Sequence, residues 1–152
     1  MYQFHQIADR FEIEALRADY ADAAMTGQYD RLTALFTDDA VYRIPAVDVL
    51  QTGRKEIQAG CEQLGGQWEY FIQTVHPGVI HLDGDAATGR GYVSELGRMR
   101  TGMSMYNYGV FHDRYRRTAD GWKFEERVFE VQYFDATPLP GSPTVVSTGD
   151  GK

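Results

Sequence analysis

One of the four histidines in this sequence, His76, is placed where it could act as a proton acceptor. It lies within the apolar run from residue 71 to 82, where period-two alternation puts it on the strand face opposite Phe71. An unperturbed imidazole, with a pKa of about 6.5, is largely neutral at pH 7 and can accept a proton. Alternation alone leaves two interpretations open, a general base or an exposed histidine.

Two further side chains are suited to stabilising developing charge. Tyr20 lies on the apolar face of the first predicted helix, where its hydroxyl either donates a hydrogen bond to a ligand oxygen or finds a partner in the core. Arg127 alternates with Phe129, and inside the fold it needs a carboxylate or a ligand anion. Glu95 and Glu125 are the candidate carboxylates, and we favour such a structural pair for Arg127.

The chain is rich in aromatic residues, with 10 Tyr, 8 Phe and 2 Trp among 152 residues. Such a surplus indicates either a crowded core or an aromatic-walled pocket. Six of these residues are candidates to line one pocket: Tyr20, Tyr42, Phe71, Tyr106, Tyr108 and Phe129. Tyr106 and Tyr108 share a strand face, which could equally be an exposed cross-strand ladder or an oligomer contact.

The elements that must position these side chains follow from hydrophobic periodicity. Helices are predicted over 8–25, 29–36 and 53–64, a short strand over 40–44, and long strands over 71–82, 86–100, 105–118 and 122–134. Helices followed by antiparallel hairpins predict an α+β fold in which helices cover one face of a curved sheet. Residues 1–135 are expected to form one domain, and the segment 136–152, rich in Pro, Gly, Ser and Thr, a tail.

Composition argues against several classes of function. The formal net charge of −7 and a pI near 5 disfavour nucleic-acid binding. A single cysteine, Cys61, allows no internal disulfide, and neither a Cys/His metal motif nor a Gly-rich phosphate loop is present. The start of the chain lacks the pattern of a signal peptide, and no apolar run is long enough to cross a membrane. We therefore expect a cytoplasmic protein without metal or cofactor that binds no membrane.

Several motifs follow one another in a characteristic order over roughly residues 7 to 135. They are Tyr29-Asp30-Arg31-Leu32, Leu35-Phe36-Thr37-Asp38-Asp39-Ala40-Val41-Tyr42, Gly53-Arg54-Lys55-Glu56-Ile57 and Asp120-Gly121-Trp122-Lys123-Phe124. This series resembles the SnoaL-like family of the nuclear transport factor two-like superfamily. The resemblance implies a cystatin-like, cone-shaped α+β fold. In it, a strongly curved mixed or antiparallel sheet wraps around a long N-terminal helix, with two shorter helices and a deep apolar pocket.

The resemblance also implies roles for individual residues. In dehydratases and a dehydrochlorinase of that superfamily, a His on the first long strand is the base, and an Asp near the end of the first helix orients it. The resemblance places the His at His76 and the Asp at Met25, which cannot orient an imidazole. It also places an active-site Tyr at Tyr20 and an anion-stabilising Arg at Arg127. Glu95 is the best-placed substitute acid.

These observations predict a cofactor-independent lyase or isomerase, with dehydratase-like proton abstraction, acting on a small apolar molecule of aromatic or polycyclic type. The resemblance implies a homodimer or homotrimer built through the open sheet face. Because Met25 replaces the orienting carboxylate, a non-catalytic small-molecule-binding protein is one alternative. A second alternative is an accessory subunit similar to the β subunit of ring-hydroxylating dioxygenases, suggested by Tyr42-Arg43-Ile44-Pro45.

Overall fold

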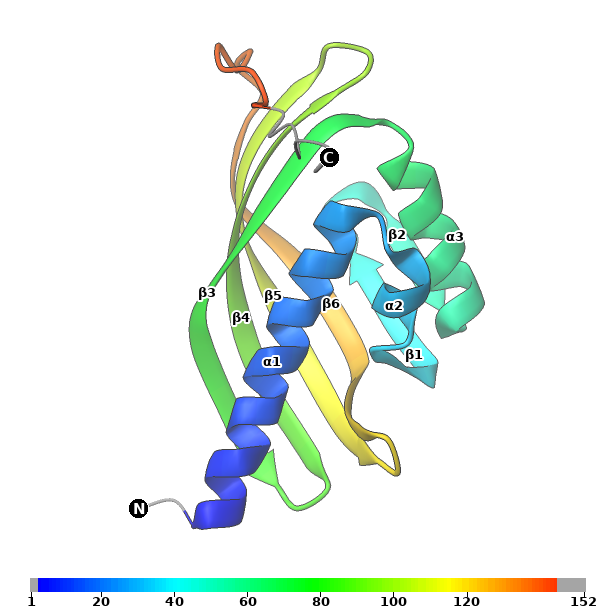
Figure 1. Cartoon of the computed structure of the whole chain (residues 1–152), viewed down its shortest axis with the longest axis vertical. Helices are drawn as coiled ribbons and strands as arrows, with labels where there is room; N and C mark the ends of the chain where they lie inside the picture. The colour runs from blue at the N-terminus through cyan, green and yellow to red at the C-terminus, as the bar shows by residue number, and fades with distance from the viewer. Residues whose placement is uncertain (1–2, 145–152) are drawn as a thin grey trace, which may run out of the picture.

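A computed structural model describes residues 3–144 of the chain (Figure 1). Three α-helices, α1 (Phe4–Thr26), α2 (Tyr29–Thr33) and α3 (Gly53–Gly65), and a 3-10 turn at Pro45–Val47 accompany six strands in this range. The strands are β1 (Phe36–Ile44), β2 (Val49–Thr52), β3 (Trp68–Asp83), β4 (Ala86–Met99), β5 (Ser104–Thr118) and β6 (Gly121–Asp135). The predicted helices and the four long strands are confirmed. The second helix ends early at Thr33, and β2 was not predicted.

The strands form one sheet in the order β2-β1-β6-β5-β4-β3. All neighbours are antiparallel except β1 and β6, which run parallel. The sheet is strongly curved and is not closed, and α1 crosses its concave side while α2 and α3 lie near β1 (Figure 1). The predicted α+β class, with a long N-terminal helix, two shorter helices and a curved mixed sheet, is confirmed.

The buried face of α1 supplies one half of the core. Ile13, Leu16, Tyr20 and Ala23 are each 6% exposed or less and recur at three- and four-residue steps. They belong to one cluster with side chains of the sheet such as Phe111. The helix ends at Thr26 because Gly27 takes a left-handed conformation, with φ of 69°, and its N–H bonds back to the helix. Residues near this end are therefore held over the sheet.

A buried arginine also joins α1 to the sheet. Arg17 is 1% exposed, and its Nε donates a hydrogen bond to the Tyr115 hydroxyl at 2.8 Å. Its guanidinium passes over strand positions that carry glycine: a Cβ on Gly89 would lie 2.6 Å from Arg17 Nη2, and one on Gly78 would lie 3.2 Å from Nη1. The absence of side chains on β3 and β4 at these positions makes room for Arg17.

The segment after β6 begins at residue 136 and is described as far as residue 144. Within it, the Leu139 N–H donates to Ser104 Oγ at 3.0 Å, so this stretch lies against the start of β5. The far end of the predicted tail, residues 145–152, lies outside the described residues. None of the described helices is both long and apolar enough to cross a membrane.

Candidate functional site

Three polar residues lie side by side across the concave side of the sheet. Gln73 on β3 pairs in register with Glu95 on β4, which pairs with Asn107 on β5. Their exposed fractions are 5%, 9% and 2%. Gln73 Nε2 donates to Glu95 Oε2 at 3.0 Å, and Asn107 Nδ2 donates to Glu95 Oε1 at 2.8 Å. We call these three residues the polar row; it presents a buried carboxylate held by two amides.

The polar row is only partly satisfied. Gln73 Oε1 and Asn107 Oδ1 are buried and have no hydrogen-bond partner in the described part of the chain. Leaving such an acceptor unpaired costs about 1–3 kcal/mol. No ion pair to Glu95 is formed by the described residues either. Burial raises the pKa of Glu95, and the two amide hydrogen bonds offset only part of that rise.

Apolar side chains and glycines flank the polar row on both sides. In strand register, one flanking row contains Val75, Val93, Gly109 and Val131, and the other contains Phe71, Gly97 and Met105. Met25, at the end of α1, covers the β3 end of the row, because its Sδ accepts a hydrogen bond from the Gln73 N–H at 3.3 Å. Since Met25 is 41% exposed, the row begins just beneath the surface. Polar groups set among apolar ones are typical of ligand sites.

The Tyr42 hydroxyl interacts with this carboxylate and with a second tyrosine, Tyr20. Tyr42 and Tyr20 share a side-chain hydrogen bond, and the charge of Glu95 contributes to the raised pKa of Tyr42, for which burial is the largest cause. Burial likewise raises the pKa of Tyr20. Both phenols are therefore protonated at neutral pH and able to donate. Tyr20 packs edge-on against core rings, including that of Phe111 at 5.7 Å, whereas Tyr42 is half-buried and more accessible.

Arg127 is a buried structural pair, as favoured from the sequence, but with a partner that was not expected. Its Nε and Nη2 donate to Asp113 Oδ1 at 2.8 Å and Oδ2 at 3.1 Å, so Asp113 replaces both Glu95 and Glu125 as its carboxylate. Burial opposes the charged form, but Asp113 outweighs it and the pKa of Arg127 is raised. The guanidinium lies 3.6 Å from the centroid of the Phe111 ring. The guanidinium is therefore paired with Asp113 and packed against an aromatic ring.

The structure does not bring His76 together with Tyr20 and Arg127. The His76 side chain is exposed on the outer face of the sheet, where its Nε2 lies 3.0 Å from Ser94 Oγ. Met25 instead accepts a hydrogen bond from the backbone N–H of Gln73, three positions earlier on β3, and the Gln73 side chain lies on the face opposite that of His76.

The tyrosines of β5 also point outward. Tyr106 and Tyr108 form an edge-to-face pair with hydroxyls 3.0 Å apart, and Tyr108 is 42% exposed. The sequence left open whether these two tyrosines line a pocket or form an exposed ladder or oligomer contact. In the structure they do not line the interior. Phe129, by contrast, is 6% exposed and packs on Phe111 at 4.9 Å.

Sequence reasoning missed Gln73, Asn107 and Asp113. The available signal was alternation: Asn107 lies between two tyrosines, and Asp113 follows His112. Alternation states which residues share a face, but not which face is covered. The packing of the whole fold supplies that information, because Gln73 and Asn107 are buried while His76 is exposed.

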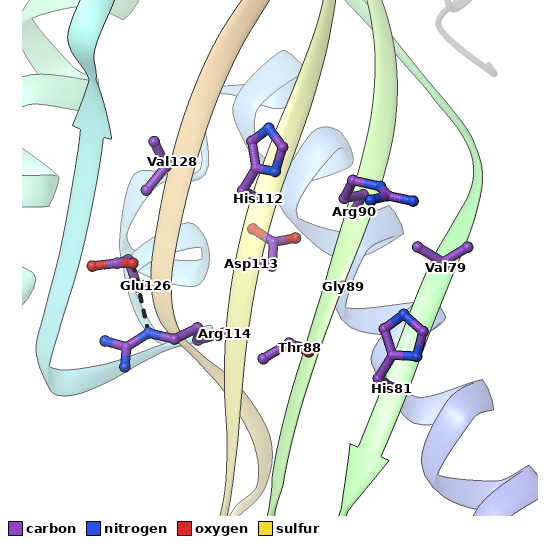
Figure 2. A pocket seen from close by; sticks show the side chains of 10 residues that line it. All are labelled: Val79, His81, Thr88, Gly89, Arg90, His112, Asp113, Arg114, Glu126 and Val128. Atoms are coloured by element: carbon purple, nitrogen blue, oxygen red, sulfur yellow. Dashed lines mark ion pairs between the residues drawn. The ribbon is translucent and has the colours of Figure 1, made fainter.

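A hollow of about 280 Å³ lies elsewhere, on the face of the sheet away from α1 (Figure 2). It is lined by Val79, His81, Thr88, Gly89, Arg90, His112, Asp113, Arg114, Glu126 and Val128. Figure 2 shows that these side chains come from β3, β4, β5 and β6. Arg114 is paired with Glu126 at 3.5 Å and His112 with Glu130 at 2.7 Å, so two of its cationic or basic groups already have partners. The polar row is the better candidate site because its orphaned groups are buried.

The chain offers no evident metal site within its described range, where no three His, Cys, Asp or Glu side chains are grouped as ligands would be. Cys61, on α3, is a thiol whose pKa burial raises to about 11. It is therefore protonated at neutral pH and a poor nucleophile.

Proteins of similar sequence and fold include dehydrochlorinases. The chain is 29% identical over 146 residues to the γ-hexachlorocyclohexane dehydrochlorinase of Sphingobium indicum, covering 93% of this chain and 90% of that protein. The crystal structure of LinA matches with a TM-score of 0.82 at 27% identity, covering 91% of this chain and 97% of the other. Hexachlorocyclohexane dehydrochlorinase LinA-type3 from Novosphingobium barchaimii matches with a TM-score of 0.79 at 25% identity, covering 92% and 96%.

The sequence also matches a known protein family. The family model of the SnoaL-like domain matches residues 5–128, which is most of the chain. The order of motifs and the curved α+β sheet agree with this match. The chain therefore belongs to the SnoaL-like family.

Proposed function

We propose that this protein is a cofactor-independent lyase or isomerase that removes a proton from a carbon atom of a small, largely apolar cyclic molecule, with Glu95 as the base. Membership of the SnoaL-like family and similarity to dehydrochlorinases support a lyase-type reaction. The observation that carries the assignment of the base is the buried carboxyl of Glu95, which has a raised pKa and no cationic partner among the described residues.

Glu95 has the properties that a general base requires. A carboxyl whose pKa is raised toward the working pH is a stronger base than an exposed one. The Gln73 and Asn107 amides each donate to one of its oxygens, which fixes the orientation of the carboxylate without neutralising it. The apolar rows on either side limit water, so electrostatic interactions in the site are stronger than in bulk solvent. Glu95 takes the role that the missing His–Asp dyad would have had.

The proposed step begins with transfer of a proton from carbon to the Glu95 carboxylate. Where the carbon is next to a carbonyl group, the electron pair of the broken C–H bond forms an enolate. The protonated Tyr42 hydroxyl, supported by Tyr20, donates a hydrogen bond to the developing enolate oxygen. In an elimination, the enolate then forms a carbon–carbon double bond as the leaving group departs with its bonding electrons. A departing hydroxide takes the proton from Glu95 and leaves as water, whereas after loss of chloride Glu95 releases the proton to solvent. In an isomerisation, Glu95 returns the proton to another carbon.

Two substrates with the same skeleton test this proposal: 3-hydroxy-1-tetralone and 3-chloro-1-tetralone. Both lose a proton from carbon 2 and a leaving group from carbon 3 to give naphthalen-1(4H)-one. This ketone tautomerises, by moving a proton from carbon 4 to the oxygen, to the fluorescent product 1-naphthol. We expect the protein to accelerate formation of 1-naphthol from at least one of them. Glu95→Gln should lower kcat/KM by about 100-fold or more, since general-base catalysis contributes about 10²–10⁴-fold. His76→Ala should change it by less than about twofold, because this ring lies on the outer face.

The two variants also distinguish the alternatives. If His76→Ala abolishes activity and Glu95→Gln does not, the base has been assigned to the wrong residue. If the folded protein binds either tetralone but forms no 1-naphthol above the uncatalysed rate, the enzyme proposal fails. The second candidate, a non-catalytic binding protein, then gains support, and Met25 at the position of the orienting carboxylate favours it.

A further inference from the structure

We infer that the ligand of the polar row is a neutral ring compound carrying a hydroxyl group, and that this hydroxyl donates a hydrogen bond into the row. The inference rests on the site named in the proposed function, and it specifies which molecules that site accepts. A molecule whose polarity comes only from carbon–chlorine bonds does not meet the requirement.

The first argument is an imbalance between acceptors and donors. Glu95 contributes two carboxylate oxygens, and Gln73 and Asn107 contribute one amide oxygen each. Each amide NH₂ group uses one of its two N–H donors on Glu95 and turns its own oxygen away from the carboxylate. Gln73 Oε1 and Asn107 Oδ1 remain buried without a partner among the described residues. Because buried polar atoms are almost always paired, the partner missing from this site is a hydrogen-bond donor.

The amide orientations support the same conclusion. If either amide were turned round, its oxygen would face a Glu95 oxygen, and two acceptors would be in contact. The orientation with NH₂ toward the carboxylate is therefore the favourable one when Glu95 is ionised. Both unpaired oxygens are then fixed as acceptors by the charge of Glu95. An ionised Glu95 and a donor-bearing ligand thus require one another.

The second argument concerns charge. The buried charged side chains of the described chain are Arg17, Glu95, Asp113 and Arg127. Arg127 and Arg17 both lie against Asp113, and Arg17 also lies 3.5 Å from Glu14, so these arginines do not pair with Glu95. A cationic ligand such as an amine would have to lose its hydration to lie beside Glu95, and in buried ion pairs this cost can exceed the Coulombic gain. A neutral hydroxyl supplies the donor at a smaller desolvation cost.

The third argument concerns the remainder of the ligand. Phe71 lies beside the polar row, and the Trp68 ring packs on it with a centroid distance of 5.2 Å. Val75 and Val93 form part of the other flank. Among the described residues, the one other buried side-chain oxygen without a hydrogen-bond partner is Thr37 Oγ1, and it lies on β1, away from these flanking surfaces. A hydroxyl on an otherwise apolar ring therefore supplies a donor for one of the two orphaned oxygens.

Three probes with the same naphthalene ring test the inference by isothermal titration calorimetry on the full-length protein. They are 2-naphthol, 2-methoxynaphthalene and protonated 2-naphthylmethylamine. We expect 2-naphthol to bind about tenfold to hundredfold more tightly than the methyl ether, because the ether cannot donate a hydrogen bond. The ammonium compound should bind more weakly than 2-naphthol.

Variants locate this preference within the structure. Asn107→Leu preserves the approximate volume but removes an orphaned oxygen, together with the NH₂ group that donates to Glu95 Oε1. It should reduce the preference for 2-naphthol over its ether to less than about threefold. Ser94→Ala, on the opposite face of β4, should leave the ratio unchanged. Should Asn107→Leu fail to fold, the wild-type comparison of naphthol with ether decides alone. Equal or tighter binding of the ether or the ammonium compound, or binding of none of the three, would overturn the inference.

This test is separate from that of the proposed function, because it measures binding and not turnover. A hydroxyl preference in a protein that never forms 1-naphthol refutes the enzyme proposal and leaves the inference standing. Turnover dependent on Glu95, combined with no hydroxyl preference, refutes the inference alone.

Discussion

Glu95 is a carboxyl that the fold buries, so its ionisation should reduce stability. Burial raises its pKa above 4.5, the ordinary value in the unfolded chain. Below about pH 4.5 the group is protonated in both states, and no penalty applies. As the pH rises toward the folded pKa, the unfolded state releases the proton first, and stability falls by about 1.4 kcal/mol for each tenfold difference in proton affinity. Urea unfolding of wild type and Glu95→Gln from pH 4 to 8 should show the variant gaining relative stability with rising pH.

A carboxylate on the outer face provides the control for this experiment. Glu126→Gln removes a partly exposed member of a surface ion pair with Arg114 and should shift stability by less than about 1 kcal/mol over the same range. A stability difference between wild type and Glu95→Gln that does not change with pH would show that Glu95 titrates normally in the folded protein.

Residue burial was predictable where a helix face supplied the evidence, and not where a strand did. Tyr20 was correctly placed on the buried face of α1, because the 3.6-residue period of that helix separates its two faces. On β3, alternation separated Phe71 and Gln73 from His76, but it could not say which set faces inward. Which face is covered depends on how α1 and β3 pack together, and they meet through residues far apart in sequence, such as Met25 and Gln73, 48 positions apart. In the structure Gln73 faces inward and His76 faces outward.

At the scale of elements, the docking of α1 depends on glycines in β3 and β4. Gly89→Ala would place a Cβ 2.6 Å from Arg17 Nη2 and 2.3 Å from the Val79 carbonyl oxygen. Because one of these contacts is backbone, the strand pair or the helix must shift. We expect a loss of about 1–3 kcal/mol in the free energy of unfolding, the usual cost of overpacking, measurable by thermal and urea denaturation.

Gly66→Ala is the matched substitution for Gly89→Ala. Gly66 has φ of −68°, and the nearest atom to its added Cβ would be 3.6 Å away, so the change should stay within about 0.5 kcal/mol. If the two variants have the same stability, the close packing of Arg17 over β4 does not limit the approach of α1.

Local elements were predictable, whereas some of their pairings were not. The β3–β4 and β5–β6 hairpins follow from Asp-Gly turns that join apolar runs adjacent in sequence. The parallel pairing of β1 with β6 joins segments about 85 residues apart, near the two ends of the domain. The four-residue β2 is too short to show a clear alternation. These features are set by the closure of the whole sheet rather than by local sequence.

At the scale of the whole molecule, the two faces of the sheet differ in chemistry. The concave side carries the polar row, while the outer side carries an aromatic patch, which we define as Tyr106, Tyr108 and Tyr133. Phe134 pairs in register with Asn107 and therefore lies on the concave side. Ring centroids of the three tyrosines lie 5.5 to 6.5 Å apart, and Tyr108 and Tyr133 are 42% and 53% exposed. Exposed apolar clusters of this kind mark interaction surfaces. Because Asn107 lies between two patch residues on β5, packing on the patch would also hold the polar row in place.

A second exposed apolar surface, on the N-terminal half of α1, allows a controlled test of the expected homodimer or homotrimer. It contains Phe4 and Phe11, which are 86% and 76% exposed. We expect the wild type to have the mass of a dimer or trimer by light scattering, because the aromatic patch spans two adjacent strands and can pack on a copy of itself. Tyr108→Glu with Tyr133→Glu should shift the mass to that of a monomer, whereas Phe4→Glu with Phe11→Glu should not. A wild-type monomer, or dissociation by the α1 variant alone, would contradict this assignment. If the monomeric variant also binds 2-naphthol more weakly, assembly through the outer face stabilises the site on the concave side.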